Sequence, residues 1–287
     1  MATLAPIITG ILLSIPTGDT VLVEDRAFGS FDHTTRIAFD IRGRCFVIDK
    51  GASSIAVFSP QFELTTSLGG FGWDLTAFDG PTGIASDGLS TFVADHGNHR
   101  VIRYDQSLTA ISALMTRDSS HAPARFGFPL GVALSRQGEL YVLDGENNRV
   151  VKFDARLRFE RSFGGIEAGI GRLRQPVDIM VGELGRVMVL EPHRIVEFDY
   201  TGNYVRSAGD GSFRQARGFG EAGTGVVVAD SAGLWFFDDR GNVTINIQHP
   251  IIDAEDGEIN DVIVRDEELF VLTNRRVIMF RLTEVGR

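Results

Sequence analysis

The strongest constraint on the fold is a pattern of residues that recurs along the whole chain. A short apolar run that ends in an aromatic residue occurs six times, at spacings of 39 to 49 residues. The aromatic residues are Phe58, Tyr104, Phe153, Phe198, Phe237 and Phe280. A β-rich segment such as CFVID, TFVAD or LYVLD precedes each run, and Gly and Asp turns separate the segments. Four short strands within about 40–50 residues are typical of one blade of a β-propeller, so the sequence predicts an all-β fold with six blades.

The two ends of the repeated region predict how the ring closes. The sixth copy ends at RVIMFRLTEVGR and has no fourth strand, whereas TVLVEDRAFGSF precedes the first copy. We therefore expect residues 20–29 to supply the outer strand of blade VI, because closure removes an exposed sheet edge. Residues 20–287 are predicted to be a single propeller domain, preceded by a separate segment at residues 1–19.

A second motif joins the strands of each copy and resembles a known repeat. Blade II contains Asp95, Asn98, Arg100 and Tyr104 in the order D-x-x-N-x-R-V-x-x-[F/Y]-D, and blade III repeats this order from Asp144 to Asp154. This motif resembles the NHL repeat, which implies a six-bladed propeller of NHL type. Blade IV departs from it, with Glu191 as its first acid, and blades I and V are eroded.

The acid and the arginine of this motif suit an ion pair, since a guanidinium meets a carboxylate with two hydrogen bonds. We expect structural pairs between neighbouring blades. These pairs would involve Asp95, Arg100, Asp144, Arg149 and Arg194. The alternative is a ring of arginines that grips an anionic ligand.

The net charge and the hydropathy of the chain restrict which partners the protein is expected to bind and where it is expected to be located. The net charge of −10 argues against nucleic acid, because such binders need a basic surface. No apolar stretch reaches the ~18 residues of a membrane helix. Residues 4–18 are apolar like the core of a signal peptide but lack a basic start. Together with a resemblance to exported bacterial NHL-repeat proteins, this favours a periplasmic or secreted protein; if residues 1–19 are not a signal, a cytoplasmic one is expected.

The sequence contains no complete catalytic signature. Zinc-dependent amidating lyases and calcium-dependent lactonases resemble this fold, but the histidines here lie outside the innermost strands, and the asparagines of the lactonase pattern are replaced. Asp40, Asp178 and Asp261 are weak candidates for acids that face the channel, where a divalent ion would find the oxygen ligands that it prefers. We expect no cofactor, with a channel-bound divalent ion as the alternative.

Three long links between blades are the remaining candidates for function. They are residues 71–80, 115–127 and 164–176. Loops on a rigid scaffold commonly carry binding residues, so Trp73, Phe78, His121 and Arg125 are predicted to form a ligand or partner surface. Alternatively, aromatic residues pin these loops to the core. The sequence therefore favours a non-catalytic scaffold that binds a protein, peptide or surface component. The alternative is a metal-dependent hydrolase or lyase that uses the channel acids.

Overall fold

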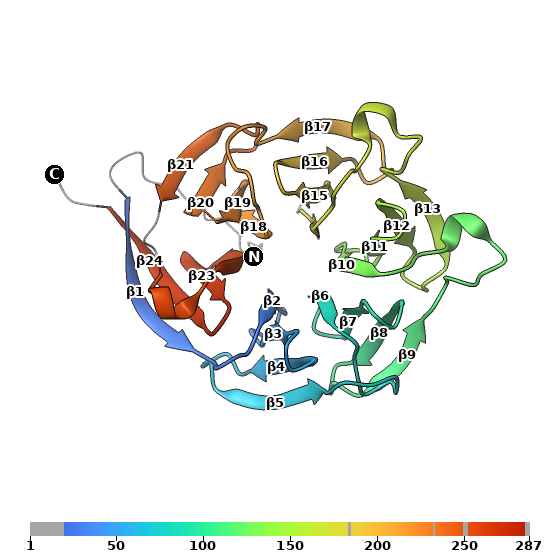
Figure 1. Cartoon of the computed structure of the whole chain (residues 1–287), viewed down its shortest axis with the longest axis horizontal. Coiled ribbons are helices and arrows are strands. Elements are labelled where there is room, and N and C mark those ends of the chain that lie inside the picture. The colour runs from blue at the N-terminus through green and yellow to red at the C-terminus, as the bar shows by residue number, and fades with distance from the viewer. Residues whose placement is uncertain (1–19, 183–184, 232, 249–251, 285–287) are drawn as a thin grey trace, which may run out of the picture.

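The computed structural model places six four-stranded sheets around a central axis. It describes residues 20–182, 185–231, 233–248 and 252–284. Viewed down that axis, the sheets radiate outward like the blades of a propeller, with β2, β6, β10 and β18 among the strands nearest the centre (Figure 1). The predicted six-bladed all-β propeller is confirmed.

Each blade is an antiparallel meander that runs from the channel to the rim. Blade I contains β2 (Thr34–Phe39), β3 (Cys45–Asp49), β4 (Ser54–Phe58) and β5 (Leu64–Gly69). Blade II contains β6 (Pro81–Ser86), β7 (Ser90–Asp95), β8 (Arg100–Asp105) and β9 (Ala110–Leu114). Blade III contains β10 (Pro129–Leu134), β11 (Leu140–Asp144), β12 (Arg149–Phe153) and β13 (Phe159–Phe163).

The other three blades follow the same plan. Blade IV contains β14 (Asp178–Val181), β15 (Val187–Glu191), β16 (Arg194–Phe198) and β17 (Tyr204–Ala208). Blade V contains β18 (Gly218–Ala222), β19 (Gly225–Asp230), β20 (Gly233–Phe237) and β21 (Val243–Gln248). Blade VI contains β22 (Ile259–Arg265), β23 (Glu268–Thr273) and β24 (Val277–Glu284), and its outer strand comes from the start of the described chain.

That outer strand is β1 (Thr20–Phe28), which pairs antiparallel with β24 along its whole length, from Thr20 opposite Glu284 to Phe28 opposite Val277. Figure 1 shows the blue β1 beside the red β24, so the two ends of the domain share one sheet. The predicted closure is confirmed. The register shifts between Glu24 and Arg26, which marks a bulge in the strand.

The core lies between the blades rather than within them. The described residues form six apolar clusters, one at each blade boundary. The middle strands are covered on both faces by neighbouring blades, and β3 and β11 are accordingly buried at every position. A strand covered on both faces reads as a continuous apolar run, which explains the recurring CFVID and LYVLD segments. Outer strands such as β5 are exposed at most positions.

Candidate functional site

The links between blades and the turns between second and third strands all lie at one end of the sheets, because the strands within each blade are antiparallel. We call this end the link face. Its longest links are residues 70–80, 115–128 and 164–177. The opposite end, the turn face, holds the turns that join first to second and third to fourth strands.

One apolar side chain from each long link is buried between two blades. Phe78, Phe126 and Leu173 are at most 1% exposed. The ring of Phe78 lies 6.4 Å from that of Tyr104, and the ring of Phe126 lies 6.2 Å from that of Phe153. Phe78 was predicted to belong to a partner surface, and this prediction is wrong: the side chain is part of the core and pins its link.

The motif ion pairs form, but within a blade rather than between blades. In blade II, Nε of Arg100 donates to Oδ2 of Asp95 over 2.7 Å, from the start of β8 to the end of β7. Asp95 accepts a second hydrogen bond, through Oδ1, from the backbone N–H of Asp79 at 2.7 Å. Arg100 also donates to the carbonyls of Trp73 and Ala77, at 2.6 and 3.0 Å. The pair therefore fastens the link that enters its own blade.

Blades III and IV repeat this arrangement. Nε of Arg149 lies 3.1 Å from Asp144, and the same guanidinium donates to the carbonyl of Arg125 at 2.8 Å. Nε of Arg194 lies 2.6 Å from Glu191 and donates, through Nη2, to the carbonyl of Arg172 at 2.9 Å. The expected pairing across blade boundaries is wrong, because each acid and arginine face one another across a single turn.

Two of the predicted acids meet at the channel. Asp178 on β14 and Asp261 on β22 line it together with Arg36 on β2. Nε of Arg36 lies 3.0 Å from Oδ1 of Asp178. The Asp261 carboxylate accepts hydrogen bonds from the backbone N–H groups of Ile37 at 3.0 Å and Val262 at 2.9 Å. A guanidinium thus already supplies positive charge to this acidic site.

Arg36, on blade I, also forms hydrogen bonds across the channel to other blades of the ring. It donates to the backbone carbonyls of Val177 at 2.7 Å and Arg217 at 3.0 Å, which precede the inner strands of blades IV and V. Burial raises the pKa of Asp261 to about 7; Arg36 opposes this shift and the Asp178 carboxylate adds to it. Burial likewise raises the pKa of Asp178, against the effect of Arg36. Such shifts occur at catalytic sites and also in structural ion networks.

The third predicted acid, Asp40, lies elsewhere, in the turn that follows β2 on the turn face. Its Oδ1 accepts from the backbone N–H groups of Arg42 and Arg44 at 2.9 Å, and its Oδ2 accepts from Nε of Arg44 at 2.7 Å. Asp40 is a turn residue and does not join the channel acids. Within the described ranges, no group of three or more His, Cys, Asp or Glu side chains is arranged to hold a metal ion.

The exposed predicted residues lie in two different links. The side chain of Trp73 projects from the first long link and is 71% exposed. His121 and Arg125 are exposed in the second. The His121 ring packs edge-on against Phe159 at 5.0 Å, and Nε of Arg125 donates to the carbonyl of Ser119 at 2.6 Å. These two side chains therefore brace their own loop, whereas Trp73 presents its ring to solvent.

Other exposed apolar side chains lie close to Trp73 in the sequence, and more lie on the other two long links. Among the described residues, seven large apolar side chains on the three long links are exposed. They are Phe71, Trp73, Leu75, Met115, Phe128, Ile166 and Ile170. The sequence predicted the three links but singled out only one of these residues, because spacing alone does not show which apolar side chain of an irregular loop enters the core.

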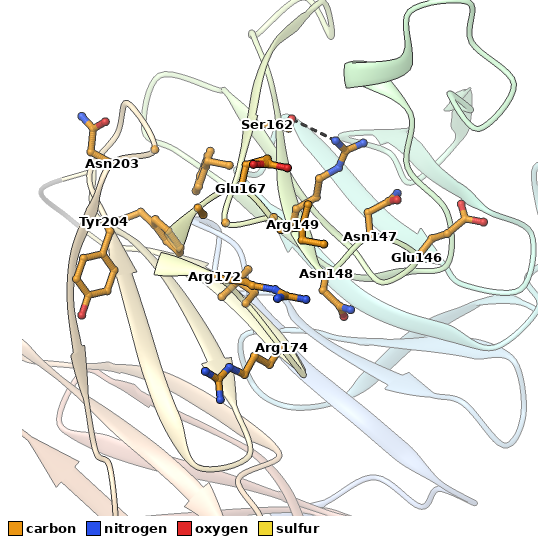
Figure 2. A pocket seen from close by; sticks show the side chains of 18 residues that line it. Glu146, Asn147, Asn148, Arg149, Ser162, Glu167, Arg172, Arg174, Asn203 and Tyr204 are labelled. Atoms are coloured by element: carbon orange, nitrogen blue, oxygen red, sulfur yellow. Dashed lines mark hydrogen bonds between the residues drawn. The ribbon is translucent and has the colours of Figure 1, made fainter. Parts of the chain in front are cut away.

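A groove of about 1000 Å³ separates blades III and IV and extends from the link face to the turn between β16 and β17. Asn147, Asn148 and Arg149 border it from blade III, and the link residues Arg172 and Arg174 border it from the other side. In Figure 2, Arg149 is turned toward Ser162, whereas Arg172 extends toward Asn148. Sequence reasoning did not find this groove. The sequence feature that could have indicated it is the pair Arg172 and Arg174, which flank an apolar residue, Leu173, in a long link.

Comparison with known proteins supports the repeat and the fold. The family model for the NHL repeat matches residues 126–153, the region of β10 to β12. No curated protein matches the chain significantly.

Solved structures resemble the whole ring. A streptogramin B lyase is 11% identical, with a TM-score of 0.65 over 92% of this chain and 98% of that one. Virginiamycin B lyase from Staphylococcus aureus is 12% identical, with a TM-score of 0.65 over 92% of this chain and 100% of that one. The extracellular domain of a one-component system from B. thetaiotaomicron is 12% identical, with a TM-score of 0.60 over 88% of this chain and 34% of that one.

At these identities the structural neighbours establish the fold alone. No helix in the described part of the chain is long and apolar enough to cross a membrane. The repeat match, the recurring D-x-x-N-x-R-V motif and the closed ring of four-stranded sheets agree with one another. The chain is a six-bladed β-propeller that contains an NHL repeat at residues 126–153.

Proposed function

We propose that this propeller is a non-catalytic scaffold that binds a protein or peptide partner on its link face. The observation that carries the proposal is the set of seven exposed apolar side chains on the three long links. Large exposed apolar patches commonly mark interaction sites. These links are also held in place. One apolar side chain of each link is buried between two blades, and a motif arginine donates hydrogen bonds to the backbone carbonyls of the link. A preorganised surface loses little entropy when it binds.

The channel charges support the same proposal. The alternative from the sequence is a metal-dependent hydrolase or lyase whose ligands are channel acids. Asp178 and Asp261 face Arg36, and their oxygens accept hydrogen bonds from backbone N–H groups. A metal ion there would have to compete with a guanidinium fixed between blades. Elemental analysis of the purified native protein tests this part: a stoichiometric divalent ion, lost in Asp178→Asn, would favour the enzyme.

The proposal includes a location outside the bacterial cytoplasm. Its support is the apolar run at residues 4–18, which lies outside the described residues. Intact mass of the native protein tests it. Removal of a segment near residues 1–19 is expected, and a mature protein that retains the segment would contradict export through a cleaved signal.

Variants on the two faces test the binding surface. Affinity capture from the native host is expected to recover a partner with the wild type and with the turn-face variant Ile41→Ala/Leu89→Ala. The same partner should be lost with the link-face variant Trp73→Ala/Ile166→Ala. All four side chains are at least 65% exposed, so neither variant disturbs the core. Loss with the turn-face variant alone, or with neither, would contradict the proposal.

A further inference from the structure

The groove between blades III and IV has a feature that the apolar surface does not explain. Arg172 and Arg174 line it, both are exposed, and neither forms an ion pair with any residue that the structure describes. Two other arginines of this face are paired: Arg117 with Glu146 at 3.0 Å, and Arg149 with Asp144. Two guanidinium groups without an ion pair therefore line one groove, which Glu146 and Glu167 also border, on a chain of net charge −10.

The backbone around these two arginines is fixed by the NHL motif of blade IV. The carbonyl of Arg172 accepts a hydrogen bond from Arg194, and the backbone N–H of Arg174 donates to the Glu191 carboxylate. Between them, Leu173 is 1% exposed in the core of the boundary between blades III and IV. With the middle residue directed inward and both flanking peptides bound, the two guanidinium groups are presented on the outer side of the link.

The rest of the groove suits a polypeptide. Apolar surface is available beside the arginines: Ile166 lines the groove and is 71% exposed, and Ile170, farther along the same link, is 74% exposed. Asn148 adds an amide group that can bond to peptide N–H and C=O groups. Gly164 and Gly165, which have no side chains, also line the groove. A guanidinium recognises a carboxylate through paired hydrogen bonds.

We propose that this groove binds an extended acidic segment of a partner protein, with its carboxylates on Arg172 and Arg174 and its apolar side chains against Ile166 and Ile170. This inference rests on the proposed function and names the chemistry of the partner. Nucleic acid would also present anions, but its binding is weakened by the net charge of −10. The neighbouring isoleucines favour a peptide.

The test uses the full chain and a library of random peptides of about 12 residues, long enough to span about 40 Å when extended. Peptides enriched on the wild type are expected to contain Asp or Glu next to apolar residues. Replacement of those acids by Asn or Gln should weaken binding about tenfold or more, because charge-assisted hydrogen bonds are lost. Raising the salt from ~0.05 to ~0.3 M should also weaken it.

Protein variants assign the effect to the groove. Arg172→Gln/Arg174→Gln should lose binding by about tenfold to a hundredfold. The matched control, Arg156→Gln/Arg240→Gln, removes the same charge from exposed residues on the turn face and should bind like the wild type. The link is held through the backbone of Arg172 and Arg174, so the groove variant is expected to fold, which circular dichroism and thermal unfolding check.

The outcomes separate this inference from the proposed function. Enriched peptides without acids, equal binding by the groove variant, or no enrichment at all would overturn it, as would preference for single-stranded RNA over every peptide. If Trp73→Ala/Ile166→Ala loses a partner that Arg172→Gln/Arg174→Gln keeps, the link face is the right surface and the acidic chemistry is wrong.

Discussion

At the scale of single residues, neighbouring aromatic side chains of one link have opposite roles. Phe78 is fully buried and Trp73 is 71% exposed, although they are five positions apart. The glycine that ends β5 explains part of this. Gly69 has φ of +101°, and a Cβ at that position would collide with the Phe78 ring. The link can therefore fold back over its plug only because the preceding strand ends in glycine.

This difference predicts a contrast in stability. Phe78→Ala should lower the free energy of unfolding by about 3–5 kcal/mol, because it leaves a cavity between blades I and II. Trp73→Ala should change it by less than ~0.5 kcal/mol, since an exposed side chain is removed. Chemical denaturation of both variants makes the comparison. Similar losses for the two would show that Trp73 also packs in the core.

Protonation at the channel should make stability depend on pH. The pKa of Asp261 is about 7 in the folded protein, above its value of about 3.9 when unfolded. The folded state therefore binds more protons than the unfolded state between these values. The stability that the protonated Asp261 carboxyl contributes is fully present below pH ~4 and is lost as the pH rises through 7. Asp178 shifts in the same direction.

Thermal unfolding of the wild type and of Asp261→Asn tests this pH dependence. The measurements cover pH 5 to 8, a range of about three units around the pKa of Asp261. The wild type should lose stability relative to the variant as the pH rises. Parallel curves would mean that the Asp261 carboxyl does not titrate in this window.

At the scale of elements, the motif ion pair holds a link, so its removal should have a local effect. Asp95→Ala leaves Arg100 without its carboxylate and the N–H of Asp79 without its acceptor. Breaking a buried pair on one side costs about 3–5 kcal/mol. We expect hydrogen exchange to increase in residues 70–80 and to stay unchanged in the links of the other blades.

The matched control is Asp105→Ala, which removes an acid from the other end of β8, on the turn face. There the Asp105 carboxylate accepts hydrogen bonds from the backbone N–H groups of Ser107 and Thr109. It should leave exchange in residues 70–80 unaltered. Increased exchange at a neighbouring blade in Asp95→Ala would instead support the pairing between blades that the sequence favoured.

Closure by β1 is a second property of an element. A chain that begins at Gly29 lacks β1 and exposes the edge of β24, where eight residue pairs otherwise form the sheet. Exposed edges promote association, so this chain should unfold at lower temperature and aggregate more than a chain that begins at Thr20. Scanning calorimetry and light scattering measure both. Equal behaviour would show that the ring does not depend on this strand.

For the whole molecule, periodic features were readable from the sequence and irregular ones were not. The blade count and the closing strand follow from the repeated apolar runs and the incomplete sixth copy, because strand patterns depend mainly on local residue order. The roles of Phe78 and Arg36 depend on contacts between segments far apart. Asp178 and Asp261 were predicted near the channel, but nothing local to them shows that Arg36 pairs with Asp178 or that the backbone N–H of Ile37 donates to Asp261.

The most direct test of a partner on the link face is photo-cross-linking in the native host. A photoreactive amino acid is placed at Trp73 or Ile166 on the link face, and at Ile41 or Leu89 on the turn face, all of which are more than 60% exposed. A discrete cross-linked partner is expected from the link-face positions only. A discrete adduct from the turn-face positions, with none from Trp73 or Ile166, would contradict it.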